Sequence, residues 1–139
     1  MRLWHYKLIH YLPKSQLLAQ WRELNSIFKN QPKHILINYV YEYPKNDLKE
    51  YVCIVIEEIK SRGYKINSMA NFEAYFGEEL LPAPIDGKLF INHHTFRYLQ
   101  QCFYNLEEKY ERGQADFSQE QYEALNELMI RQWEKEIPF

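Results

Sequence analysis

The chain has 139 residues and a formal net charge of −2, with 46% apolar and 17% aromatic side chains. This length and composition fit one compact domain with a hydrophobic core. No run of about 18 apolar residues occurs, so we expect no membrane-spanning helix.

The small net charge hides an asymmetry between the two halves. Residues 1–66 carry 11 Lys and Arg against 6 Asp and Glu, a net charge of +5, whereas residues 67–139 carry 6 and 13, a net charge of −7. Two solvated faces of opposite sign would explain this pattern, and so would a polyanion-binding N-terminal half. Charge alone favours two solvated faces.

The N-terminal stretch and the cysteines indicate the compartment. The stretch MRLWHYKLIHYLPK is interrupted by Lys7 and by two histidines, and no small-residue cleavage site follows, so we expect no signal peptide. Cys53 and Cys102 fall in apolar helical patterns, which favours buried, reduced thiols. We therefore expect a cytoplasmic protein.

The first predicted helix covers roughly residues 13–29, with Pro13 early in its first turn. Four apolar side chains at helical spacing form one stripe: Leu17, Trp21, Leu24 and Phe28. Glu23 lies beside this stripe, on a polar edge that also holds Gln16 and Ala19. Glu23 is thus predicted to lie off the core, next to a small residue that leaves room beside it.

The middle of the chain is less regular. The segment HILINYVYEY fits either a strand or a helix, and we favour the helix. A helix capped by Asn46 or Asp47 follows and ends near Gly63. Residues 64–92 show no sustained period and are predicted to be irregular, with a short helix near 72–76.

Two more helices complete the predicted fold. One covers roughly residues 93–111, and the other opens at the capping-box pattern Ser118-x-x-Gln121 and continues through an apolar series that reaches Trp133. The chain is therefore predicted to be a single all-α domain over residues 1–139, a compact bundle of three to five helices.

Common catalytic and metal-binding signatures do not occur in the sequence. There is no phosphate-binding glycine loop, no C-x-x-C pair and no G-x-S-x-G elbow. His93 and His94 are adjacent, and neighbours on a helix point about 100° apart, so surface or capping roles are favoured over a metal site. We expect neither a metal nor a cofactor.

The first 35 residues hold a single acidic side chain, Glu23, among six basic ones: Arg2, Lys7, Lys14, Arg22, Lys29 and Lys33. Residues 16–24, QLLAQWREL, resemble the His-Leu-Met-Ala-Glu-Tyr-Arg-Glu-Leu run of the pyrimidine-dimer DNA glycosylase family, typified by phage endonuclease V. Phe28 and the pair Lys33-His34 also match, and IEEIKSRGYKI at 56–66 is similar to a family helix ending in Lys-Arg-Gly-Phe-Asn-Ile. The last 70 residues match only in being helical and aromatic.

The resemblance implies a small all-α domain whose N-terminus packs beside the first long helix. It also implies a glycosylase with abasic-site lyase activity that acts on double-stranded DNA and flips out a nucleotide. The α-amine of Met1 would attack the sugar C1′ and form a Schiff base, since part of an α-amine population is neutral near pH 7. Glu23 would stabilise the cationic sugar and transfer protons, and Arg22 would contact the DNA near the lesion.

By the same resemblance, Arg2, Lys29, Lys33 and His34 are expected to bind DNA. For Lys33 and His34, the local pattern alone indicates only a loop near a helix end.

The sequence departs from the family at several positions. The phage enzyme exposes a threonine amine after its methionine is removed, whereas the large Arg2 predicts that Met1 is retained here. A one-residue insertion between about residues 4 and 16 places Met1 on the nucleophile and Arg2 on the arginine that follows it, and we favour that alignment over the ungapped one. Gln16 and Ser26 replace a family histidine and arginine.

Two other functions remain open. One is a non-catalytic descendant of the fold that binds nucleic acid or a protein through its basic N-terminal face. The other is a small-molecule or nucleotide-processing enzyme that keeps the amine and Glu23. The acidic second half favours these alternatives, and the context of Arg22 and Glu23 favours the repair enzyme; we expect a monomer.

Overall fold

The computed structural model describes residues 1–78 and 87–136, and these residues form helices, turns and loops without any strand. The α-helices are α1 (Lys14–Asn30), α2 (Lys45–Ser61), α3 (Ala70–Phe76), α4 (Phe96–Glu111) and α5 (Gln119–Glu136), and the 3-10 helices are η1 (Tyr6–Tyr11) and η2 (Asn38–Glu42). The predicted all-α bundle is confirmed. Within the described ranges, no helix is long and apolar enough to cross a membrane.

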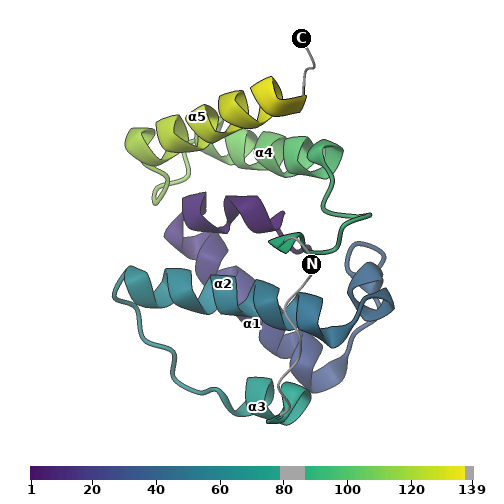
Figure 1. Ribbon diagram of the computed structural model, residues 1–139. Coiled ribbons are helices and arrows are strands. Elements are labelled where there is room, and N and C mark those ends of the chain that lie inside the picture. The colour runs from purple at the N-terminus through teal and green to yellow at the C-terminus, as the bar shows by residue number, and fades with distance from the viewer. Residues whose placement is uncertain (79–86, 137–139) are drawn as a thin grey trace.

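The N-terminal segment lies in the middle of the bundle. In Figure 1, α4 and α5 lie side by side as one layer, α1 and α2 cross below them, and η1 lies between the two layers. η1 contacts α2, α4 and α5, and its Leu8 and Ile9 are fully buried. The expected packing of the N-terminus against the first long helix is confirmed by Arg2 and Trp4, whose backbone is hydrogen-bonded to Gln20 of α1, and the segment also forms part of the core.

The predicted helix ends are confirmed where a local signal sets them. α1 follows Pro13 at its N-cap. At α5, the Ser118 Oγ accepts a hydrogen bond from the Gln121 N–H at 3.1 Å, and the Gln121 Oε1 accepts one from the Ser118 N–H at 3.0 Å. This is the reciprocal pair that the capping-box spacing predicts.

Other predicted boundaries were wrong. Neither Asn46 nor Asp47 caps α2, which begins at Lys45 because Pro44 holds the N-cap position. The Asp47 carboxylate instead accepts a hydrogen bond from the Phe90 N–H at 3.0 Å. The helix predicted to begin near residue 93 begins at Phe96, because the Thr95 side chain accepts the hydrogen bond of its first turn.

The segment 34–43 is neither the strand considered nor a full α-helix. It forms a turn followed by η2, which ends ahead of Pro44 because a residue that precedes proline is driven out of the helical region. Within the predicted loop 64–92, α3 confirms the short helix near 72–76, and residues 79–86 lie outside the described ranges.

One prediction of burial was also wrong. Cys102 is buried, but Cys53 is only half-buried, and both are free thiols. Trp133, at the end of the apolar series of α5, is 50% exposed.

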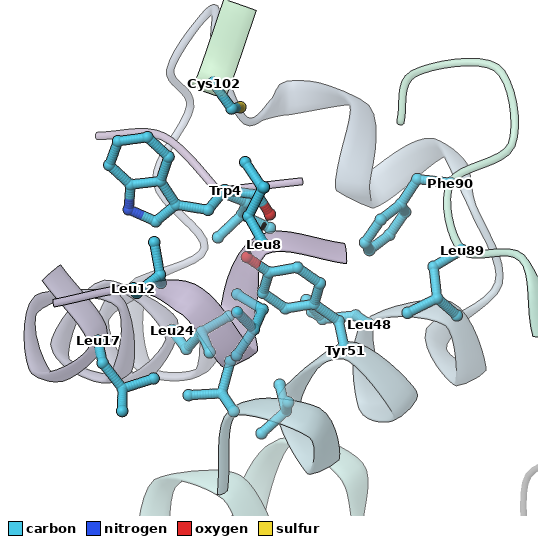
Figure 2. Packing of buried hydrophobic residues seen from close by; sticks show 14 of the residues in the cluster. Trp4, Leu8, Leu12, Leu17, Leu24, Leu48, Tyr51, Leu89, Phe90 and Cys102 are labelled. Carbon is cyan, nitrogen blue, oxygen red and sulfur yellow. Dashed lines mark hydrogen bonds between the residues drawn. The ribbon is translucent and has the colours of Figure 1, made fainter. Parts of the chain in front are cut away.

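Tyr51 of α2 connects the core to the N-terminal segment. Its ring is fully buried, and Figure 2 shows it between Trp4 on one side and Phe90 on the other. The Tyr51 hydroxyl lies 2.6 Å from the carbonyl oxygen of Trp4 and 2.9 Å from Oε1 of Gln20. The single hydroxyl proton is shared between these two acceptors, which links α2 to residue 4 and to α1.

Two neutral histidines are buried beside η1. The His5 Nδ1 accepts a hydrogen bond from the Lys7 N–H at 3.1 Å, so its ring proton lies on Nε2 and is donated to the His94 carbonyl at 2.9 Å. The His94 Nδ1 accepts from the Tyr6 N–H at 3.2 Å, and its Nε2 lies 2.7 Å from the Tyr39 hydroxyl. Burial lowers the pKa of His5 to about 4 and that of His94 to about 2.

We expect the free energy of unfolding to fall as the pH drops from about 6.5 towards 4. In this window the unfolded chain protonates His5 and His94 while the folded protein keeps them neutral, so the unfolded state binds more protons. The full contribution is present above about pH 6.5. Urea unfolding between pH 4.5 and 7.5 measures the slope.

His5→Gln tests whether His5 contributes to this dependence of stability on pH. It should lower stability at pH 7, because the hydrogen bond to Lys7 is lost, but it should also flatten the dependence on pH. An unchanged slope in His5→Gln would assign the acid sensitivity to other groups.

Candidate active site

A pocket of about 320 Å³ opens where the N-terminal residues pass along α1 and face α4. The N-terminal segment, α1 and α4 each contribute one wall: Met1, Arg2 and Trp4; Gln16, Ala19, Gln20 and Glu23; and Asn105, Glu108 and Lys109. The polar edge predicted beside the apolar stripe therefore faces a real cavity, and Ala19 lies on it as a small residue.

Glu23 is half-buried in this pocket. Its Oε2 accepts a hydrogen bond from Gln20 Nε2 at 3.0 Å. Burial raises the pKa of the Glu23 carboxyl, while the charge of the Met1 amine, a backbone hydrogen bond from Arg2 and the nearby Arg22 oppose that rise. The carboxyl is thus partly desolvated and lies within the electrostatic reach of the N-terminal amine.

Gln20 joins Glu23 to the N-terminal backbone. Only 1% of Gln20 is exposed. Its Oε1 accepts from the Trp4 N–H at 2.8 Å and from the Tyr51 hydroxyl at 2.9 Å, and its Nε2 also donates to the Arg2 carbonyl at 3.2 Å. One buried amide therefore sets the distance between the start of the chain and the Glu23 carboxylate.

Sequence reasoning missed Gln20. The available signal was its position three residues before Glu23, at the border between the apolar stripe and the polar edge, where a buried amide needs partners.

Arg2 lies at the boundary between this pocket and a second one. Its guanidinium stands 5.7 Å from the centre of the Tyr98 ring, and the Tyr98 hydroxyl donates to the Leu3 carbonyl. The second pocket, of about 570 Å³, is lined by Arg2, Ile35, Leu36, Tyr39, His93, Tyr98, Gln101, Tyr104 and Asn105. Arg2 and Asn105 line both pockets, so the two cavities are neighbours.

Of the residues predicted to act in catalysis, Met1 and Glu23 line one pocket and Arg22 does not. Arg22 is exposed beside it, and its charge acts on Glu23. Arg2, predicted to bind DNA, is brought into the pocket as well.

The other predicted DNA-binding residues lie away from the pocket. Lys29 is exposed in the last turn of α1, about 9 Å along the helix axis from Glu23. Lys33 and His34 are exposed in the segment after α1. None of these three side chains lines the pocket.

The α4 wall was not predicted at all. Asn105, Glu108 and Lys109 lie on the solvent side of a predicted helix, and no motif distinguishes them. Gln16, which replaces a family histidine, also lines the pocket and donates to Gln114 Oε1 at 3.1 Å. Only the packing of distant helices reveals the residues of the α4 wall.

The two adjacent histidines differ: His93 is exposed, as the surface role predicts, whereas His94 is buried. His94 belongs to the buried network beside η1. The His93 ring stacks on Tyr39 with centroids 4.6 Å apart, and its Nδ1 lies 2.7 Å from the Tyr43 hydroxyl. Among residues 1–78 and 87–136, no group of three His, Cys, Asp or Glu side chains is placed to hold a metal ion.

Comparison with known families places these observations in context. Residues 1–72 match the family described as Pyrimidine dimer DNA glycosylase. Neither the curated proteins nor the solved structures contain a match. The matched region spans more than half of the chain, and it includes η1, α1 and α2 together with the walls that carry Met1, Arg2 and Glu23. The chain therefore belongs to the pyrimidine dimer DNA glycosylase family.

Proposed function

We propose that this protein is a DNA repair enzyme that removes pyrimidine dimers or related damaged bases from double-stranded DNA and then cleaves the abasic site. The observation that carries this proposal is the pairing of Met1 and Glu23 in one pocket, with the amine close enough to act on the carboxyl pKa. An amine nucleophile beside a partly desolvated carboxylate is the pair that imine-forming glycosylase chemistry requires.

In the proposed reaction, the neutral Met1 amine attacks C1′ of the damaged nucleotide. The N-glycosidic bond breaks, its electron pair leaves with the base, and the sugar ring opens to give a protonated imine. Removal of a proton from C2′ then expels the 3′ phosphate oxygen from C3′. Water hydrolyses the imine and restores the amine.

Glu23 acts on the charges that develop in these steps. Its carboxylate faces the positive charge that forms on the sugar, and the partly desolvated pocket strengthens that attraction. Because burial raises its pKa, Glu23 can also accept and return a proton closer to neutral pH than an exposed glutamate can.

The exposed basic residues supply the proposed contacts to the DNA backbone. Arg22, Lys29, Lys33 and His34 lie on α1 and the segment after it, and Arg2 lies in the pocket. Phosphate contacts of this kind give affinity without sequence preference and make binding dependent on salt. They also explain why Glu23 is the single acid among the first 35 residues.

Borohydride trapping tests the nucleophile. When the protein is mixed with a duplex that carries a thymine dimer or an abasic site, borohydride should reduce the imine to a stable adduct that peptide mass spectrometry assigns to Met1. The intact mass of the protein identifies the N-terminal residue. An adduct on Lys109, which also lines the pocket, would contradict the assignment to Met1. Salt-dependent duplex binding without any adduct would favour the non-catalytic alternative. If the protein forms no adduct and does not bind the duplex, a small-molecule enzyme is favoured.

Glu23→Gln tests the carboxylate. The substitution keeps the size of the side chain but removes the charge and the proton-transfer group, so the rate on a dimer substrate should fall about 100-fold or more. The dimer adduct should disappear with it. Glu57→Gln, at an exposed position of α2, should leave the rate unchanged. A Glu23→Gln enzyme with the wild-type rate would remove Glu23 from the mechanism.

Gln20→Met tests the positioning of the amine relative to Glu23. The Trp4 N–H and the Arg2 carbonyl lose their partner, so stability should fall by about 1–3 kcal/mol and kcat by about tenfold, with little change in KM. Tyr51→Phe is the matched control, because it removes a buried hydroxyl and leaves both donor bonds of Gln20 in place. Tyr51→Phe should lower stability without lowering kcat. Urea unfolding measures the stability, and steady-state kinetics measure kcat. Equal loss of kcat in both variants would indicate a purely structural role.

A further inference from the structure

Two aliphatic side chains project from the surface in the turn between α1 and η2. Ile35 is 86% exposed and Leu36 is 41% exposed, whereas the next residue, Ile37, is fully buried. An isoleucine exposed to this degree gains nothing from the core, so its apolar surface remains available for a partner.

The turn that carries them is held by its own hydrogen bonds. The N–H groups of Ile37 and Asn38 both donate to the His34 carbonyl at 2.9 Å. The His34 N–H donates to Asn38 Oδ1 at 2.8 Å, and the Leu36 N–H donates to His34 Nδ1 at 3.2 Å. The tip is thus a fixed projection, and His34 organises its backbone.

The projection stands next to the candidate active site. Ile35 and Leu36 line the second pocket, which shares Arg2 and Asn105 with the pocket of Met1 and Glu23. Exposed cationic or titratable side chains precede the tip at Lys33 and His34. An apolar tip that follows basic groups and lines the cavity beside the candidate active site fits double-stranded DNA, which has phosphates outside and stacked bases inside.

We propose that the Ile35–Leu36 turn is a wedge that enters the base stack beside the damaged nucleotide, with Lys33 and His34 on the flanking phosphates. This inference rests on the proposed function. Proteins that bend DNA insert aliphatic side chains of this kind between base steps, and the cost of unstacking is offset by the contacts that the bent duplex makes. The second pocket lies beside the wedge and next to Arg2, where space is needed for displaced groups of the strand.

Local unstacking gives a direct readout. The probe is a duplex with a tetrahydrofuran abasic analogue, which cannot form an imine, and 2-aminopurine at the neighbouring position. Binding of the wild-type protein should raise the 2-aminopurine fluorescence about threefold or more, because the base leaves the stack. The double variant Ile35→Ala, Leu36→Ala should lose most of this rise at saturating protein. Its rate on a dimer duplex should fall about tenfold, because the unstacking that the wedge assists is no longer supported.

A matched control removes an exposed aliphatic residue elsewhere. Ile130 of α5 is 51% exposed and lines neither pocket, so Ile130→Ala should keep the fluorescence rise and the rate. A double variant that keeps the full fluorescence rise and the dimer rate would overturn the wedge. The wedge would also be overturned if sedimentation showed that the wild-type protein forms a protein dimer and the double variant is a monomer. The apolar tip would then bind a second copy of the chain.

An abasic site in single-stranded DNA separates this test from that of the proposed function. No duplex stack has to be opened there, so the double variant should form the borohydride adduct as well as wild type does. Absence of the adduct in the wild type on every substrate would contradict the proposed function. Adduct formation by both proteins on the single strand, together with an unchanged fluorescence rise in the variant, would contradict the wedge alone.

Discussion

The hydrogen bonds of one buried amide determine the geometry on which the candidate site depends. Gln20 holds the backbone of Arg2 and Trp4 with one end and the Glu23 carboxylate with the other. Without that link, the first residues would be an ordinary chain terminus, and termini are poorly ordered unless they are tied down. The amine, the acid and the cation of Arg2 share a pocket because a side chain with no charge of its own connects their elements.

The two walls of the pocket have different origins in the sequence. The wall with Met1, Arg2 and Glu23 falls within the region that matches the family, whereas Asn105 and Lys109 come from α4, outside that region. The residues proposed to carry the chemistry and the α4 residues that face them across the pocket therefore come from different parts of the sequence. Residues on α4 can change the size and charge of the cavity while the hydrogen bonds of Gln20 stay intact.

Periodicity predicted the helices and the α1 wall of the pocket. The other walls are set by how the helices pack. The spacing of apolar residues in α1 and the Ser118 box at α5 are local signals, and the structure follows both. The start of α2 was mispredicted because Pro44 outweighs the Asp47 signal, and Ile35, in a segment for which a helix was favoured, lies exposed in a turn. Gln20 had a local signal in its spacing from Glu23, but Lys109 could not be found from the sequence, since its role arises only where distant elements meet.

The central position of η1 has a consequence for the order in which the protein forms. Leu3 accepts a hydrogen bond from Tyr98, and Lys7 donates one to Gln132 at 3.0 Å, so this segment pairs with residues far along the chain. During synthesis, the apolar side chains of residues 3–12 have no complete site to pack into until α4 and α5 have emerged. Such distant pairing slows folding, because a long loop must close before its contacts can form. The segment proposed to carry the chemistry is thus completed only when these distant helices have packed against it.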